Sequence, residues 1–168
     1  EVIRRVRGFV GHRERSLELA DCNVLLKEIL PLAELYTRSK QIHLRTELAK
    51  RVPFVRIDIV QIQQVLLNLI RNATEAMEEV SVGDEIRIGI REAAAGIEIS
   101  VSDLGPGIDP KDMEQVFDSF YTTKAEGLGI GLSLSRNIVE AHCGSLTASN
   151  NRYGGATFTL YLPTTAEA

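Results

Sequence analysis

The chain has 168 residues, of which 44% are hydrophobic and 25% charged, as in an ordinary globular domain with a substantial core. Its formal net charge of −4 argues against a general nucleic-acid-binding protein. The two cysteines, Cys22 and Cys143, lack the spacing of metal ligands, which favours reduced thiols in the cytoplasm over a disulfide or a zinc site.

Residues 1–15 combine arginines with an apolar stripe at helical spacing. Because the chain begins at Glu1 inside this pattern, we expect it to be a piece of a longer protein. A short strand is predicted over residues 16–20. Asn23 is placed to cap a helix over residues 24–39, which Pro31 should kink or break.

Apolar and polar residues alternate over residues 42–48, which predicts a strand, and a second short strand follows at 54–57. The most regular helical pattern of the chain covers residues 58–80. Asp58 can cap that helix, and Gln61 stands in the spacing of a capping box.

The rest of the chain alternates between strand patterns and one more helical pattern. The expected elements are strands at 86–90 and 97–101 with a hairpin turn at 93–96, a helix at 128–142 that Gly144 ends, a hairpin with strands at 145–150 and 155–162, and a frayed tail from Pro163. These elements predict an α/β fold, a two-layer sandwich in which about three helices pack on one face of a mixed, mostly antiparallel sheet.

Two glycine clusters lie between residues 103 and 132, one after a predicted strand and one at the start of a predicted helix. Their members are Gly105 and Gly107, and then Gly127, Gly129 and Gly131. Glycine lets backbone N–H groups approach a ligand closely, and a helix N-terminus favours anions, so this stretch is predicted to bind a nucleotide. The second cluster is neither a Walker loop nor a convincing dinucleotide fingerprint.

Asp103 follows the strand at 97–101 with the parity of its apolar residues, so its side chain should point toward the core. A buried carboxylate is costly unless a donor hydrogen-bonds it. Asp103 could accept from an exocyclic amine such as adenine N6, or it could cap the glycine turn that follows. Taken alone, the residue supports both interpretations equally.

Asn68 and Asn72 lie one turn apart on the same face of the helix at 58–80. Asparagine is a mediocre helix former, so two in register suggest a use. An amide oxygen suits Mg²⁺, which completes its shell with water and phosphate oxygens, and Arg71 could meet a phosphate. Without the glycine clusters, a solvated polar face would be the better explanation.

Residues 108–126 connect the two glycine clusters without a strong period. A connection this long in a compact domain is usually functional and often a lid. Phe117 and Phe120 can pin it to the body of the domain, and Lys124 could reach a terminal phosphate, although a solvated loop lysine is a serious rival. The three histidines form no site and are expected to be ordinary surface or packing residues, namely His12, His43 and His142.

Taken together, these residues resemble the catalytic ATP-binding domain of sensor histidine kinases, in the ATPase superfamily shared with the gyrase B subunit, a heat-shock chaperone and MutL. The resemblance covers roughly residues 20–163 and rests on four motifs in order. These motifs are residues 68–73 (N box), 103–108 (G1 box), 117–124 (F box) and 127–132 (G2 box).

The resemblance implies a Bergerat-type ATP-binding fold. It divides the chain into the end of the dimerisation and phosphoacceptor hairpin at 1–15, the catalytic domain at 16–163 and a tail at 164–168.

The resemblance also implies roles for single residues. Asn72 would coordinate Mg²⁺, Arg71 would contact phosphate and Asp103 would accept from adenine N6. Glu75 would lie near the metal or its waters, and Lys124 joins Asn72 and Arg71 as a catalytic candidate. The remaining expected contacts to ATP are Asn68, Gly105, Gly107, Ile108, Phe120, Thr123, Lys124, Gly127, Gly129, Gly131 and Leu132.

The chain departs from the family pattern at three points. Ser119 stands where many F boxes carry proline, and Ala156 stands where relatives often place a small hydroxyl. The neighbouring Thr157 has the parity of the opposite face and is not a candidate. No phosphoacceptor histidine motif is present and His12 does not match one, so the acceptor is expected upstream of this sequence.

The resemblance implies a protein histidine kinase that transfers the γ-phosphate of Mg-ATP to a histidine on a helical hairpin of the same or the partner subunit, for relay to a response-regulator aspartate. Hydrolytic relatives place glutamate where Asn68 stands, and an amide cannot act as a general base, which favours transfer over hydrolysis. The parent protein is expected to be a cytoplasmic homodimer, either soluble or membrane-attached, and the isolated domain is compatible with a monomer.

Three alternatives stay open. The first is an ATP-gated conformational module of the gyrase and chaperone type, against which Asn68 argues. The second is a serine kinase that binds a sigma factor, against which the helical pattern at 1–15 argues. The third is a non-enzymatic interaction domain that has kept only the fold.

Overall fold

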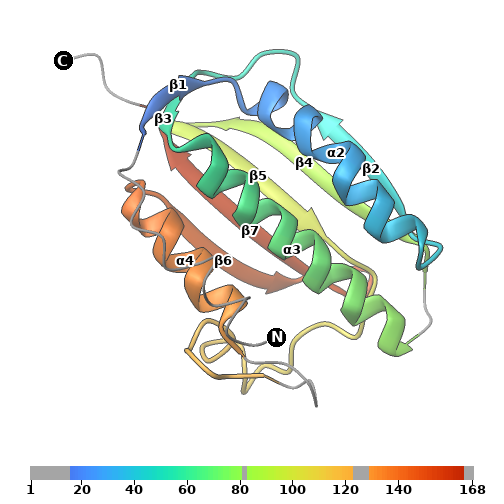
Figure 1. The fold of residues 1–168 in the computed structure, drawn as a ribbon. Helices are drawn as coiled ribbons and strands as arrows, with labels where there is room; N and C mark the ends of the chain where they lie inside the picture. The colour runs from blue at the N-terminus through green and yellow to red at the C-terminus, as the bar shows by residue number, and fades with distance from the viewer. Residues whose placement is uncertain (1–15, 81–82, 123–128, 165–168) are drawn as a thin grey trace, which may run out of the picture.

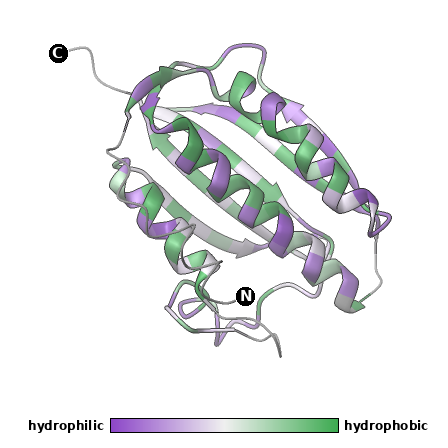
Figure 2. Ribbon diagram, viewed as in Figure 1, coloured by the Kyte–Doolittle hydropathy of each residue, from purple (hydrophilic) through white to green (hydrophobic). Residues whose placement is uncertain are grey.

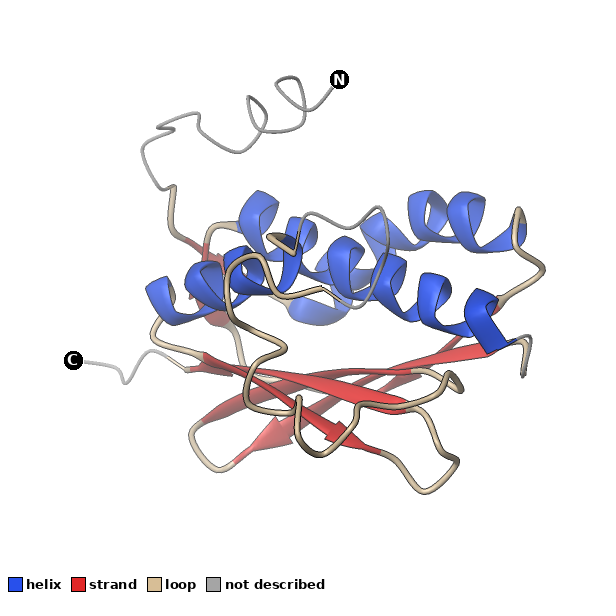
Figure 3. Ribbon diagram, turned by 90° about the horizontal axis from the view of Figure 1, so that it is seen from below, coloured by secondary structure: helices blue, strands red, loops and turns tan. Residues whose placement is uncertain are grey.

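The structure is a computed structural model that describes residues 16–80, 83–122 and 129–164. The predicted helix at 1–15 and the end of the predicted tail lie outside these residues. Figure 1 shows a layer of helices over a sheet, and Figure 3 shows that the helices lie on one side of it. The predicted two-layer α/β fold is confirmed.

The main sheet has five strands in the order β2-β4-β5-β7-β6. Only β2 and β4 pair in parallel, and the other neighbours are antiparallel. The strands are β2 (His43–Leu48), β4 (Glu85–Ala93), β5 (Gly96–Ser102), β6 (Ser145–Asn150) and β7 (Ala156–Pro163). A separate antiparallel ribbon joins β1 (Glu18–Ala20) to β3 (Val55–Ile57).

Three helices cover the sheet in the described part of the chain: α2 (Cys22–Arg38), α3 (Ile59–Val80) and α4 (Gly131–Ala141). The core lies between the layers, because alternate residues of β4, β5 and β7 are buried against the apolar faces of the helices. Figure 2 shows the resulting mixture of hydrophobic and hydrophilic positions along each element. No described helix has both the length and the apolar character that a membrane span requires.

The start and the course of α2 differ from prediction. Asp21 caps the helix in place of Asn23, because its side chain accepts a 2.8 Å hydrogen bond from the Asn23 backbone N–H. Pro31 lies inside α2 and does not break it. Pro31 is exposed, so water can satisfy the carbonyl of Lys27 that loses its helical partner.

The start of α3 carries the predicted cap but only half of the capping box. The Asp58 carboxylate accepts from the Gln61 backbone N–H at 3.1 Å, as expected. The Asp58 backbone N–H donates instead to Nε2 of His142 at 3.0 Å, while Nδ1 of that ring lies 2.7 Å from the Ile138 carbonyl. Both bonds form together only if the ring is neutral with its proton on Nδ1, so the buried His142 joins the end of α4 to the start of α3.

Two details of the region from α4 to β7 also differ from the prediction. Cys143, rather than Gly144, adopts the left-handed conformation after α4, with φ of 57°. Gly144 donates its N–H to the Val139 carbonyl at 3.0 Å and is needed for space, because a Cβ there would overlap the Tyr161 carbonyl. Pro163 belongs to β7, where it pairs with Gly96, and does not begin a frayed tail.

Replacing His142 should destabilise the domain. His142→Ala leaves the Asp58 N–H without its acceptor in a buried place, so we expect the free energy of unfolding to fall by about 2 kcal/mol. His43→Ala, at an exposed position of β2, should change it little. Urea unfolding of both variants measures this, and equal effects would show that the His142 bridge contributes nothing of its own.

Candidate functional site

Asp103 directly follows β5 and has almost all of its polar atoms engaged. Its backbone N–H donates to the Ala156 carbonyl at 2.9 Å, and its carbonyl accepts from Nδ2 of Asn151 at 2.9 Å. Its Oδ1 accepts from the backbone N–H groups of Gly105 at 2.9 Å and Ala156 at 3.0 Å. Within the described residues, Oδ2 has no hydrogen-bond partner. Asp103 therefore caps the glycine turn with one oxygen and keeps the other available for a ligand.

The surroundings of this carboxyl disfavour its charge. Asp103 is only 4% exposed. Burial raises the pKa of its carboxyl, while the N–H groups of Ala156 and Gly105 act in the opposite direction. An amino group brought to Oδ2 would supply the hydrogen bond that a buried carboxylate lacks.

The turn after Asp103 packs too closely for side chains. A Cβ at Gly105 would lie 3.1 Å from the Cβ of Ala76 on α3. Gly107 has φ of +74°, and a Cβ there would lie 2.7 Å from the Gly154 carbonyl. The first glycine therefore brings the turn against α3, and the second is required by both conformation and space.

One face of α3 connects the two glycine clusters. Asn68, Asn72 and Ala76 follow one another at four-residue spacing and so lie in a row. Ala76 contacts the turn at Gly105, and the Asn68 amide lies against Gly131 at the start of α4, where an added Cβ would be 2.8 Å from Oδ1. Asn72 lies between these contacts, which are about 12 Å apart along the helix.

Both ends of the Asn68 amide are held by protein groups. Its Nδ2 donates to Oγ of Ser135 on α4 at 3.1 Å, and its Oδ1 accepts from Arg71 at 3.0 Å. Arg71 also lies 3.7 Å from the Glu75 carboxylate, and it is half exposed. Asn68 therefore joins α3 to α4 and holds the Arg71 guanidinium beside the row.

Asn72 differs from Asn68, because its amide makes no hydrogen bond with the part of the chain that the structure describes. It is half-buried and so is held in place by its surroundings. The described residues contain no cluster of three or more His, Cys, Asp or Glu side chains that could hold a metal. A Mg²⁺ ion at Asn72 would have to complete its shell with water and phosphate oxygens, which is the coordination that Mg²⁺ prefers.

The start of α4 has no side-chain cap among the described residues. The residue before the helix, Ile130, makes none, so the first-turn N–H groups of Gly131 and Leu132 are candidates for binding an anion. Gly129 has φ of +64°, and a Cβ there would lie 2.6 Å from the Tyr121 carbonyl. Both conformation and space therefore favour glycine at position 129.

The two phenylalanines of the predicted lid behave differently. Phe117 packs edge-on against Phe158 of β7, with ring centroids 6.1 Å apart, and Arg136 lies over its ring at 5.2 Å. Phe117 therefore pins the lid to the body, as predicted. Phe120 does not, since it is 76% exposed with φ of 71°. Its N–H donates to the Gly129 carbonyl at 2.8 Å, which joins the lid to the second glycine cluster.

The structure therefore brings together most of the predicted site. Three predicted residues, Thr123, Lys124 and Gly127, lie outside the described residues. Ile108 begins the lid and is held by Asn150, through bonds of 2.7 Å to its N–H and 2.8 Å to its carbonyl. Three further residues of the site were not predicted from the sequence, because asparagines in a hairpin turn and a serine in a helix carry no signal of their own: Asn150, Asn151 and Ser135.

Thr157 lies away from the site, as its parity predicts. Its hydroxyl is 2.8 Å from that of Ser102, on the sheet face opposite the helices. At Ala156 the backbone N–H meets Asp103, so this position contributes to the site without a side-chain hydroxyl.

Comparison with known proteins identifies this arrangement. A family model described as histidine kinase-, DNA gyrase B-, and HSP90-like ATPase matches residues 57–166. The chain belongs to this ATPase family. The matched segment contains the α3 row, the turn after Asp103 and the start of α4.

Within the ATPase family, sensor kinases are among the similar proteins. The chain is 41% identical over 167 residues to the C4-dicarboxylate transport sensor protein DctS of Rhodobacter capsulatus, covering 99% of this chain and 25% of that protein. It is 40% identical over 167 residues to the sensor protein FixL of Bradyrhizobium diazoefficiens, covering 99% of this chain and 33% of that protein. The chain thus spans a quarter to a third of these relatives.

Solved structures of histidine kinases share the fold. The catalytic domain of histidine kinase ThkA is 32% identical, with a TM-score of 0.78, and the match covers 89% of this chain and 96% of that one. ThkA in complex with the response regulator protein TrrA is 28% identical, with a TM-score of 0.80, covering 98% of this chain and 46% of that one. These matches confirm the predicted family, the catalytic ATP-binding domain of sensor histidine kinases.

The raised pKa of Asp103 predicts a pH-dependent cost in the nucleotide-free domain. The folded state holds this proton more tightly than the unfolded chain, so stability falls as the pH rises through and above the ordinary carboxyl value of 3.8. Asp103→Asn keeps an oxygen for Gly105 and Ala156 but removes the charge. We expect its melting temperature, relative to that of the unaltered chain, to rise between about pH 4 and about pH 7.

The matched control is Asp109→Asn. Asp109 is exposed, and hydrogen bonds from the Lys111 N–H and side chain lower its carboxyl pKa, so its variant should show no rise or the opposite trend. Thermal unfolding across this pH range decides the point. A pH-independent loss of stability in Asp103→Asn would show that burial of the charge has no cost.

Proposed function

We propose that this chain binds Mg-ATP along the α3 row and transfers its γ-phosphate to a histidine on a helical hairpin outside the described residues. The observation that carries the proposal is the row itself. An Asn72 amide without a partner among the described residues lies between a turn whose Asp103 Oδ2 has no described partner either and a helix start without a described side-chain cap. Bound ATP would place its base at the carboxylate, a metal-bound phosphate at Asn72 and its terminal phosphate at the helix start.

Base recognition falls to the turn. Oδ2 of Asp103 accepts from the adenine amino group, and Gly105 and Gly107 leave room for a planar ring beside the backbone. Adenine binding would also compensate the desolvation that raises the pKa of Asp103.

Phosphate binding falls to the two helices. The Asn72 amide oxygen is the protein ligand for Mg²⁺, which when bound neutralises phosphate charge. Arg71 is half exposed beside it and can turn from Asn68 toward a phosphate. The first-turn N–H groups of Gly131 and Leu132 face the phosphate chain, and Gly127, Thr123 and Lys124 would extend this contact from the lid.

Transfer needs little covalent chemistry from this domain. An acceptor imidazole is itself the nucleophile, so positioning and charge neutralisation suffice. Asn68 cannot act as a general base toward water, which favours transfer over hydrolysis. By analogy with ThkA, whose structure includes a response regulator, the phosphoryl group would pass on to such a partner. The parent protein would be a cytoplasmic homodimer.

The activity is tested with γ-labelled ATP, the chain and the parent protein's histidine hairpin supplied separately. We expect an acid-labile phosphohistidine on the hairpin and slow ATP turnover without it. Brisk hydrolysis in the absence of any acceptor would replace the kinase assignment with an ATP-gated module.

Alanine substitutions of the two asparagines in the row should have different effects on Mg-ATP affinity and on stability. Asn72→Ala should lower Mg-ATP affinity by about tenfold or more with little change in melting temperature, because its amide has no partner to lose among the described residues. Asn68→Ala should cost about 1–2 kcal/mol of stability, since Ser135 and Arg71 lose their contacts. Calorimetric titration with Mg-ATP and thermal unfolding separate the two effects. Unchanged affinity in Asn72→Ala would remove the metal site from this position.

A further inference from the structure

The hairpin turn between β6 and β7, residues 150–154, contacts both ends of the turn from Asp103 to Ile108, called the base-binding turn below. Neither the family pattern nor the motifs assign a role to this hairpin. Its first two residues, Asn150 and Asn151, reach across to residues that lie more than forty positions earlier in the chain. Adenine and phosphate binding leave these contacts unexplained.

Asn150 holds the far end of the base-binding turn. Its Oδ1 accepts from the Ile108 N–H at 2.7 Å, and its Nδ2 donates to the Ile108 carbonyl at 2.8 Å. The side-chain amide thus pairs with both backbone groups of one residue, as a neighbouring strand would. Asn150 is exposed, so these bonds, rather than burial, position it.

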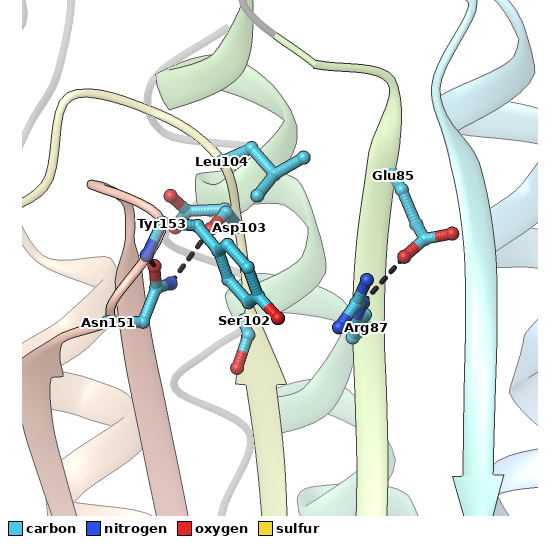
Figure 4. A pocket seen from close by; sticks show the side chains of 7 residues that line it. All are labelled: Glu85, Arg87, Ser102, Asp103, Leu104, Asn151 and Tyr153. Carbon is cyan, nitrogen blue, oxygen red and sulfur yellow. Dashed lines mark hydrogen bonds and ion pairs between the residues drawn. The ribbon is translucent and has the colours of Figure 1, made fainter.

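Asn151 holds the near end. Its Nδ2 donates to the Asp103 carbonyl at 2.9 Å and to the Ala156 carbonyl at 3.2 Å, while its Oδ1 accepts from the Tyr153 N–H at 3.0 Å. Figure 4 shows Asn151 and Tyr153 beside Asp103. Together with the bonds from Gly105 and Ala156, this bond engages three of the four polar atoms of Asp103, which restricts the position of Oδ2.

The hairpin is itself anchored to the sheet. Tyr153 lies under the guanidinium of Arg87 on β4, 5.4 Å from its ring centroid, and Arg87 pairs with Glu85 at 2.6 Å. With Asp103 and Asn151, these residues line a cavity of about 110 Å³ (Figure 4). Arg87 and Glu85 lie on the face of the sheet opposite the helices, so the hairpin connects the base-binding turn to that face.

We propose that Asn150 and Asn151 are positioning residues for base selection. On the proposed function, the two asparagines hold the turn from Asp103 to Ile108 at both ends. Oδ2 of Asp103 then meets the amino group of the base at a fixed place. A freely moving carboxylate would still attract donors but would discriminate poorly among bases. The two asparagines therefore act on nucleotide selectivity through Asp103 without touching the base.

The test compares ATP with ITP, whose base carries a carbonyl oxygen where adenine carries its amino group. Affinities of both nucleotides are measured by calorimetric titration for the unaltered chain, Asn150→Ala, Asn151→Ala and a matched control, Asn137→Ala, at an exposed position of α4. We expect the preference for ATP over ITP to fall by about fivefold in the first two variants, the size of effect that one hydrogen bond produces. The control should keep the preference.

The outcomes are distinct. If Asn150→Ala and Asn151→Ala lower the melting temperature but keep the preference, the asparagines serve folding only and this inference is wrong while the proposed function stands. If the unaltered chain binds ATP and ITP equally, Asp103 does not read the base and the proposed base recognition fails first. Because Asn150 is exposed, its variant is expected to fold even if Asn151→Ala does not, and it then decides the test alone.

Discussion

A buried carboxylate, with one oxygen that no described residue hydrogen-bonds, is the constraint on which this site depends. Asp103 is 4% exposed, and two backbone N–H groups hydrogen-bond its Oδ1. The two N–H groups favour the ionised form, but burial outweighs them and raises the pKa of the carboxyl, and no described residue hydrogen-bonds the second oxygen. Three neighbouring elements hold the carboxyl in place: β7 through Ala156, the β6–β7 hairpin through Asn151, and α3 through the close approach of Ala76 to Gly105.

The second organising element is α3, which positions groups at both ends of the site. Its apolar face is buried against the sheet, so the helix cannot rotate without exposing the core. The row from Asn68 to Ala76 is therefore held at a fixed angle. Asn68 joins the row to α4 through Ser135, and His142 joins the start of α3 to the end of α4. With these two bonds the start of α4, proposed to face phosphate, is held relative to Asn72, the proposed metal position.

Periodicity and motif order were sufficient to predict the two layers, the mixed and mostly antiparallel sheet, and the face of α3 that carries the asparagines. They were sufficient because burial repeats every two residues in a strand and about every 3.6 in a helix. They failed where one residue meets a distant one. The bond from Asp58 to His142 replaces half of a capping box, and the pairing of Asn150 with Ile108 joins residues forty-two positions apart. Local sequence patterns cannot predict contacts between such distant residues. The prediction that Phe120 pins the lid was wrong for a different reason: its exposure follows from a left-handed backbone conformation that no local sequence pattern signals.

The described part of the lid, residues 108–122, is anchored to the body of the domain where it leaves the turn after Asp103. At one end Ile108 is paired by Asn150, and further along Phe117 is packed against Phe158, so the lid is fixed where it leaves the base-binding turn. Phe120, shortly before the undescribed residues 123–128, holds a left-handed conformation that costs about 1–2 kcal/mol for a residue with a Cβ, and its N–H donates to the Gly129 carbonyl. A strained backbone of this kind is a place where a small input can change the conformation. On the proposed function, the turn that would hold adenine is therefore fixed by contacts separate from the strained residue.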